Sequence, residues 1–230
     1  MPEPKSRFTA AFCILDFYPS VRMINSVKTL PSTTLDARLL EQQLRQEDAL
    51  LSGHFRLSSG LHSDTYVQCA RYLRRPELAA PAAAALAAQI QAAGLRPDVV
   101  VGPAMGGVVI GYEMARQLGV PGIFTERDAE GQMVLRRGFT IEPGEKVVIA
   151  EDVVTTGKST LEVAKVLRGM GAEVLAVVSL IDRTGGKGGL DFPHFALLPV
   201  VAATFAPESC PLCAAGVPVV KPGSRPEKAF

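Results

Sequence analysis

Three uninterrupted apolar runs constrain the fold of this chain more than any other feature. The runs "DVVVG" (98–102), "KVVIAED" (146–152) and "EVLAVVSLID" (173–182) are rich in β-branched residues, as in strands that are covered on both faces. Helical patterns at 106–119 and 157–171 separate them, so we expect right-handed crossovers between parallel strands. The sequence therefore predicts an α/β fold, a doubly wound parallel sheet with a small accessory hood layer.

The rest of the chain is assigned around this sheet. The 230 residues suit one main domain. Residues 1–33 show no sustained period and are expected to form a loosely ordered extension. Residues 34–205 are expected to hold the main domain, beginning with a Leu-rich helix at about 35–51. The Pro- and Gly-rich residues 206–230 are read as a tail.

Composition excludes several classes of protein. The chain has 24 Lys and Arg against 23 Asp and Glu, a net charge of +1. It therefore lacks the excess positive charge that is typical of proteins that bind nucleic acid. No stretch approaches the roughly 18 apolar residues of a membrane span. Four cysteines are too few for a disulfide scaffold, and the N-terminus lacks a convincing signal peptide. We expect a cytoplasmic protein.

The cysteines near the C-terminus form one Cys-x-x-Cys, at Cys210 and Cys213. A structural zinc ion needs four ligands, and a second pair of cysteines is missing. We therefore expect a thiol pair in a turn and no metal site, with metal or redox use as the alternative. His54 and His62 receive no assigned role, since each is as compatible with a structural function as with a chemical one.

The stretch "EDVVTTGKST" (151–160) is the strongest candidate for chemistry. It follows a strand, at the carboxyl edge where open parallel sheets bind ligands. The helix that begins near Lys158 points free N–H groups and a partial positive charge at the preceding loop, which favours an anion. Hydroxyl donors are expected from Thr155, Thr156, Ser159 and Thr160. These features predict a site for a phosphate monoester.

A triphosphate-binding P-loop is excluded because that motif needs a glycine where this chain has Asp152. Glu151 and Asp152 need another partner, and the vicinal hydroxyls of a sugar are a natural one for carboxylates. We therefore expect a sugar phosphate, with the phosphate in the loop and the sugar against the acids. The alternative is that the two acids only cap the next turn.

The segment "VVIAEDVVTTGKS" (147–159) resembles the phosphoribosyl pyrophosphate signature of type I phosphoribosyltransferases. The resemblance implies that Glu151 and Asp152 are the catalytic residues. The residues that it implies for binding phosphoribosyl pyrophosphate are Arg127, Glu151, Asp152, Val153, Val154, Thr155, Thr156, Gly157, Lys158 and Ser159.

Three further segments, 53–69, 99–111 and 179–183, resemble the orotate phosphoribosyltransferases within that group. The resemblance implies that Thr155 and Arg183 contact orotate. Arg183 suits the carboxylate of orotate, which a guanidinium can hold with two hydrogen bonds. Tyr66 is our own aromatic candidate for the base pocket. The alternatives are an Arg183 that pairs with a surface acid and a Tyr66 that belongs to the core.

The chain departs from the family pattern in its basic residues. Many members carry lysines where this chain has Ser58 and Gly106. The mobile loop of the family corresponds to the shorter and less basic 126–139, whose second half is expected to be one arm of a hairpin. Arg127 matches one basic position of that loop, and Arg136 or Arg137 is expected to compensate for the others.

The resemblance implies a complete reaction. Orotate attacks C1 of phosphoribosyl pyrophosphate, and the products are orotidine 5'-monophosphate and pyrophosphate. It also implies Mg²⁺ bound with phosphoribosyl pyrophosphate and a homodimer. Two alternatives remain, a phosphoribosyltransferase for another base and a regulator that senses phosphoribosyl pyrophosphate while contacting nucleic acid. The near-zero net charge argues against the regulator.

Overall fold

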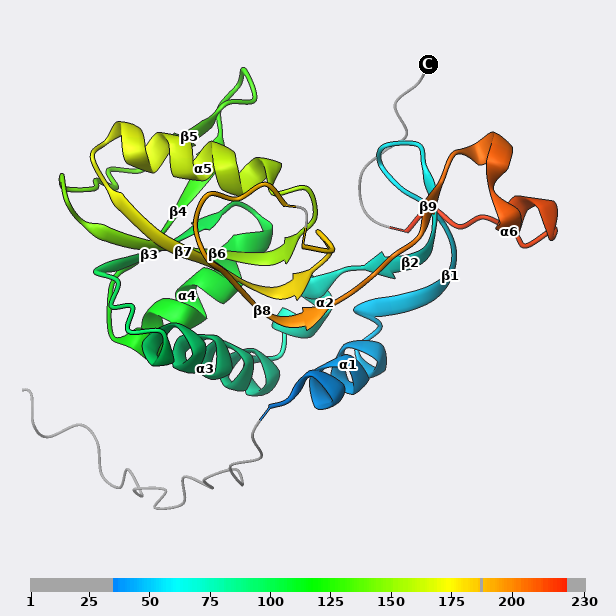
Figure 1. The fold of residues 1–230 in the computed structure, drawn as a ribbon, viewed down its shortest axis with the longest axis horizontal. Helices are drawn as coiled ribbons and strands as arrows, with labels where there is room; N and C mark the ends of the chain where they lie inside the picture. Colours follow the sequence, from blue (N-terminus) through cyan, green and yellow to red (C-terminus); the bar gives the residue numbers. More distant parts are fainter. Residues whose placement is uncertain (1–34, 187, 223–230) are drawn as a thin grey trace, which may run out of the picture. The chain divides into compact units, whose positions relative to one another are not determined.

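The structure is a computed structural model that describes residues 35–186 and 188–222 (Figure 1). All of the described residues belong to one compact unit, residues 34–230. The predicted N-terminal extension lies outside the described residues. None of the helices in the described ranges is long and apolar enough to cross a membrane.

A six-stranded sheet in the order β5-β4-β3-β6-β7-β8 forms the centre of the fold. All neighbouring strands are parallel except β5, which runs antiparallel to β4 at the edge. The strands are β3 (Val99–Pro103), β4 (Gly122–Arg127), β5 (Met133–Leu135), β6 (Lys146–Val154), β7 (Glu173–Asp182) and β8 (His194–Pro199). The predicted parallel α/β sheet is confirmed.

Helices cover both faces of this sheet, which explains the uninterrupted apolar runs (Figure 1). On one face Val100 and Val148 pack in a cluster with α3 and α4, and on the other Val101 and Ile149 pack in a cluster with α5. The helices are α1 (Ala37–Gln46), α2 (Cys69–Leu73), α3 (Pro76–Ala92), α4 (Gly106–Leu118) and α5 (Lys158–Gly169).

The first predicted helix is wrong at its C-terminal end. The side chain of Asp36 caps α1 by accepting a hydrogen bond from Leu39 N at 2.8 Å, and the helix ends at Gln46. Asp48 then adopts a left-handed conformation, with φ 50°, which interrupts helical geometry. Leu50 belongs to the following strand and is buried there. Leu50 was predicted to be helical because its spacing from the earlier leucines fits a helix.

A second, three-stranded sheet has the order β1-β2-β9 and forms the predicted accessory layer. Strands β1 (Leu50–Arg56) and β2 (His62–Val67) make an antiparallel hairpin, and β9 (Thr204–Phe205) pairs with β2. The tail then forms the short helices η1 (Pro207–Ser209) and α6 (Pro211–Ala214). It finally returns to β1, where Val220 makes an isolated bridge to Phe55.

Candidate functional site

The candidate site lies at the carboxyl end of β6, where the chain turns into α5. Glu151 and Asp152 lie within β6, just before its last residue, Val154. A loop of three residues, 155–157, connects the strand to α5. Thr155 and Thr156 in this loop are exposed. The strand therefore supplies two acids and the loop supplies hydroxyls at one edge of the sheet.

The turn into α5 depends on Gly157. This residue is the N-cap of α5 and has a left-handed conformation, with φ 74°. An added Cβ would also lie 2.8 Å from the carbonyl oxygen of Gly188, so the position excludes a side chain on two grounds. Gly157 provides no side-chain cap, and Lys158 N donates to Thr156 Oγ1 at 3.4 Å. The N–H groups of the first turn point toward the loop, as in anion sites at helix N-termini.

Glu151 is nearly fully buried, at 5% exposure. Its Oε1 accepts hydrogen bonds from Ser159 Oγ at 2.9 Å and from Thr160 Oγ1 at 3.4 Å. The pKa of Glu151 is raised to about 7, mainly by burial; the hydrogen bonds from the two hydroxyls lower it and the negative charge of Asp152 raises it. In this arrangement Ser159 and Thr160 serve the carboxylate. The hydroxyls that remain for a phosphate are those of Thr155 and Thr156.

Asp152 lies against the start of α4. Its Oδ1 accepts a hydrogen bond from Val153 N at 2.8 Å, and burial raises the pKa of its carboxyl group. A Cβ added to Gly106 would lie 2.5 Å from Asp152 Oδ1. The carboxylate therefore occupies the space that a side chain at position 106 would need. This contact gives a physical reason for the absence of a lysine there.

Arg183 lies beside the loop because of the pairing between β6 and β7. Val154 pairs with Asp182, and Arg183 N donates to Val154 O at 2.8 Å, so Thr155 and Arg183 leave the sheet side by side. Arg183 Nε is buried and has no hydrogen-bond partner among the described residues. Burial lowers the pKa of Arg183, while the negative charge of Asp64 raises it. A buried donor without an acceptor is rare and indicates a place for a ligand.

The arginines of the 126–139 segment are all paired with acids. The predicted hairpin is confirmed, but Arg136 and Arg137 follow β5 instead of lying in it. Arg127 Nη2 lies 2.6 Å from Glu162 of α5, and Arg137 Nη2 lies 2.8 Å from Glu126. Arg136 Nε lies 3.6 Å from the same Glu126. The arginine side chains are about half exposed, whereas Glu162 and Glu126 are less exposed, at 31% and 19%. The predicted role of Arg127 stays a prediction.

Tyr66 has its described contacts within the hairpin. Its ring packs against Phe55, with centroids 5.7 Å apart, and its cross-strand neighbour is Leu51. It also lines a hollow of about 260 Å³ formed by Asp48, Leu51, Tyr66, Gln68, Arg71 and Pro222. None of these other residues was predicted to bind a substrate. The role of Tyr66 in the base pocket therefore stays a prediction.

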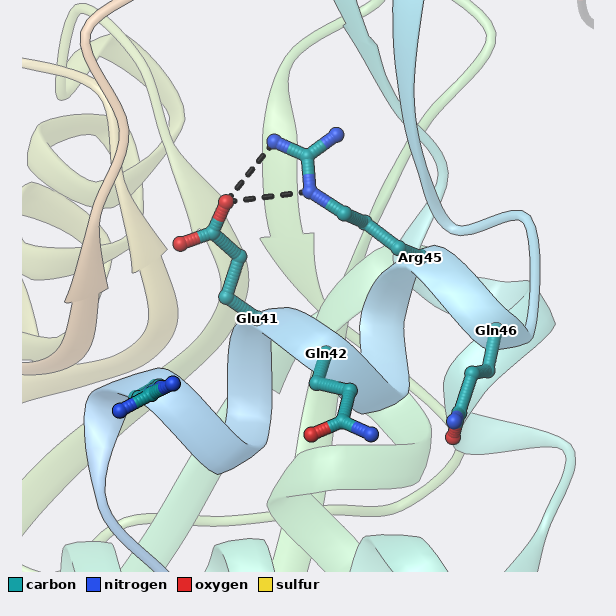
Figure 2. Close-up of a pocket in the computed structure, with 5 residues that line it drawn as sticks. Glu41, Gln42, Arg45 and Gln46 are labelled. Carbon is teal, nitrogen blue, oxygen red and sulfur yellow. Dashed lines mark hydrogen bonds and ion pairs between the residues drawn. The ribbon is translucent and has the colours of Figure 1, made fainter.

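A second hollow, of about 350 Å³, lies along α1 (Figure 2). It is lined by Arg38, Glu41, Gln42, Arg45 and Gln46, which all belong to this one helix. Glu41 and Arg45 are joined by an ion pair of 2.8 Å. The hollow brings together no residues from different elements, so it is a feature of the surface of α1 and not a second candidate site.

Two polar residues near the site were missed by the sequence analysis. Thr125, in β4, is fully buried, and its Oγ1 has no partner among the described residues. Its carbonyl oxygen accepts from Ala104 N at 2.7 Å, in the loop that leads into α4. Asp64, in β2, is the acid whose charge acts on Arg183. A polar residue near the end of a strand is the only signal that the sequence offered for either.

The buried Glu151 should make stability depend on pH. Its pKa is raised from 4.5 to about 7 in the folded protein, so the folded state holds a proton that the unfolded state has released. The free energy of unfolding should therefore fall by up to about 3 kcal/mol as the pH rises through this window. Denaturant titrations at several pH values in this window give the free energy of unfolding at each pH. This free energy should change less with pH in Glu151→Gln than in the wild type. The control Glu130→Gln changes an exposed acid and should keep the wild-type pH dependence of the unfolding free energy. The same pH dependence in Glu151→Gln would contradict a raised pKa for Glu151.

Comparison with known proteins agrees with this site. Residues 70–204 match the model of the phosphoribosyl transferase domain family. The protein named orotate phosphoribosyltransferase from Carboxydothermus hydrogenoformans is 54% identical over 180 residues, which are 78% of this chain and 94% of the relative. The protein of the same name from Heliobacterium modesticaldum is 50% identical over 181 residues, with coverages of 79% and 94%.

The fold is also that of a solved structure. The crystal structure of orotate phosphoribosyltransferase from Aeropyrum pernix superimposes with a TM-score of 0.58 and 28% identity, covering 70% of this chain and 93% of that one. Half of the residues are thus identical over nearly the full length of the two relatives, and the fold and the domain match agree with them. The chain therefore belongs to the orotate phosphoribosyltransferase family.

Proposed function

We propose that this chain transfers the 5-phosphoribosyl group from phosphoribosyl pyrophosphate to orotate, in the synthesis of pyrimidine nucleotides. The products are orotidine 5'-monophosphate and pyrophosphate. The observation that carries the proposal is the buried, unpartnered Nε of Arg183 beside Thr155, at the end of the strand that bears Glu151 and Asp152. The guanidinium group of Arg183 can donate two hydrogen bonds to a carboxylate, so its position suits a base that carries one.

Phosphoribosyl pyrophosphate would span the two halves of the site. The 5-phosphate would bind the loop 155–157 and the N–H groups at the start of α5, where the partial positive charge of the helix favours an anion. The ribose hydroxyls would donate to Glu151 and Asp152. Because Glu151 holds its proton up to a pH of about 7, binding of hydroxyl donors and a cation would favour its ionised form.

The two carboxylates would also act in the transition state. Breaking the bond between C1 and pyrophosphate builds positive charge on the ribose, as in glycoside chemistry. Negative groups that are fixed in a buried place stabilise such charge without needing to reorient. Attack by the orotate anion then forms the new bond to C1, so this scheme needs no covalent intermediate with the protein.

We propose Mg²⁺ as the cofactor, bound together with phosphoribosyl pyrophosphate. Glu151 and Asp152 would hold it, and their carboxylates are the hard oxygen ligands that Mg²⁺ prefers. When bound, the ion neutralises charge on the leaving pyrophosphate. Arg127 is paired with Glu162 in the absence of ligand, and it would add positive charge on exchanging that partner for pyrophosphate. A homodimer belongs to the same proposal and rests on the family resemblance, and a cytoplasmic location is proposed from the sparse cysteines.

The proposed function can be tested by offering one base at a time. The purified chain is incubated with phosphoribosyl pyrophosphate and Mg²⁺, together with orotate, uracil, adenine or hypoxanthine, and consumption of each base is followed. We expect turnover with orotate alone. Turnover with a different base would assign the chain to another phosphoribosyltransferase activity. Binding of phosphoribosyl pyrophosphate without turnover of any base would favour the regulator.

Arg183→Ala should impair the use of orotate. Loss of a charge-assisted hydrogen bond of about 1.5–3 kcal/mol corresponds to a tenfold to hundredfold lower kcat/KM for orotate. The KM for phosphoribosyl pyrophosphate should change little, because Arg183 is not among the residues proposed to bind that ligand. Arg183→Lys should recover only part of the loss, since lysine keeps the charge but lacks the guanidinium group. The exposed Arg38→Ala on α1 is the matched control, and equal kinetics in Arg183→Ala and Arg38→Ala would refute the orotate anchor.

Gly106→Ala should displace Asp152. The added methyl group would lie 2.5 Å from Asp152 Oδ1, so the carboxylate or the start of α4 must move. We expect kcat/KM for phosphoribosyl pyrophosphate to fall by about tenfold or more, which corresponds to about 1.4 kcal/mol of lost transition-state stabilisation. Gly169→Ala in α5 is the control, because a Cβ there meets no atom within 4 Å. Wild-type kinetics in Gly106→Ala would contradict the prediction, because they would show that the position of Asp152 does not affect kcat/KM.

A further inference from the structure

Four side chains that the reaction does not use meet at the accessory sheet. His54 comes from β1, His62 from β2, and Cys210 and Cys213 from the start of α6. Their ligand atoms, one from each residue, all lie within 4.8 Å of one another. The second ligand pair that the sequence analysis missed is therefore a pair of histidines, and His54 lies 156 positions before Cys210.

The separations between these atoms suit a tetrahedral metal ion. Bonds of about 2.0–2.1 Å to nitrogen and about 2.3 Å to sulfur place neighbouring ligand atoms roughly 3.3–3.8 Å apart. The close contacts are His54 Nε2–His62 Nδ1 at 2.8 Å, Cys210 Sγ–His54 Nε2 at 3.4 Å, Cys213 Sγ–His54 Nε2 at 3.7 Å and Cys213 Sγ–His62 Nδ1 at 3.3 Å. Three of these already have the separation of ligands on one ion.

The protonation of the two imidazoles supports the same conclusion. His54 Nδ1 lies 2.8 Å from the carbonyl oxygen of Val217, which can only accept, so Nδ1 carries the hydrogen. In a neutral imidazole with this tautomer, His54 Nε2 presents its lone pair to the cluster. A backbone carbonyl that orients a histidine in this way is the usual outer partner of a metal-bound imidazole. With Nε2 only 2.8 Å from His62 Nδ1, a proton or a cation must lie between the two nitrogens.

The choice of ion follows from the ligands. Two thiolates and two imidazoles are the ligand set of structural zinc sites, and the Cys-x-x-Cys spacing is typical of them. His54, His62 and Cys210 are buried, with exposures of 3%, 6% and 3%, while Cys213 is exposed and leaves a path for entry. Four protein ligands fill a tetrahedral shell and leave no position for a substrate. We propose that His54, His62, Cys210 and Cys213 bind one structural Zn²⁺ ion.

The described part of the tail, residues 206–222, buries little apolar surface. Helix α6 has four residues, none of them buried, and the residues from 213 to 220 are exposed. Backbone hydrogen bonds join the tail to β1 near its end, from Val220 N to His54 O at 2.8 Å and from Arg56 N to Val220 O at 2.9 Å. A segment that buries so little apolar surface depends on another source of stability, and a metal ion is a common one.

The ion would also stabilise strand β2, which carries a residue that acts on Arg183. Strand β2 carries His62 at its start and Asp64 two residues later, and Asp64 acts on Arg183. The proposed ion would fix the position of β2 relative to β1 and the tail without taking part in the reaction. The zinc proposal does not depend on the proposed function, because its test measures metal content and stability instead of turnover.

The test uses the full-length chain without a polyhistidine tag. After expression with zinc supplied, elemental analysis should find one zinc ion per chain, and the wild-type protein loaded with Co²⁺ should show the absorption bands of tetrahedral thiolate coordination. Removing zinc with a chelator should lower the Tm by at least about 4 °C, and added Zn²⁺ should restore it. The wild-type measurements need no variant, so they remain decisive if a variant fails to fold.

Variants then locate the ion. Cys210→Ser and His62→Gln should each lose the bound zinc and the chelator-dependent change in Tm. His194→Gln replaces a histidine that is not part of the cluster and should retain both. A protein that contains no zinc and does not bind Co²⁺, with thiols 210 and 213 free, would overturn the proposal. So would a disulfide between Cys210 and Cys213 in the protein purified under non-reducing conditions, which would support the redox alternative.

Discussion

Strand β6 is hydrogen-bonded on both sides, to β3 and to β7, and the position of its carboxyl end determines the rest of the site. Through β7 it places Arg183 beside Thr155. Through the close approach of α4 it places Asp152 against Gly106. Through the loop at Gly157 it directs the start of α5 at the same point. Each of these groups comes from a different segment, and the pairing of one strand is what they share.

The electrostatic state of this site is unusual for a protein that binds polyanions. Glu151 is buried and its neighbour Asp152 is partly buried, and in the described residues no cation pairs with either. The nearby arginines of the hairpin are engaged with Glu126 and Glu162 instead. The raised pKa values of both acids record the energetic cost of this arrangement. Ligand binding would supply positive charge that the described residues do not place beside either acid.

The sequence predicted those features that depend on local patterns. The apolar runs fixed the parallel sheet, and the acids, threonines and glycine at 151–157 lie on the predicted strand end and loop. Prediction failed where distant segments compete for one residue. Leu50 belongs to a strand although its spacing fits a helix. The hydrogen bond from Ser159 to Glu151 was not foreseen, and the predicted role of Ser159 in substrate binding stays a prediction. The histidines that join Cys210 could not be found from spacing, because only the fold brings them together.

The contact between β1 and the tail has a topological consequence. His54 and Cys210 are separated by 156 positions, so a link between them encloses most of the described part of the chain in a single loop. The entropy lost on closing a loop grows with its length, and a link that survives in the unfolded chain deprives that state of many conformations. The tail, which buries little surface of its own, would then stabilise the whole domain by restricting the disorder that competes with folding.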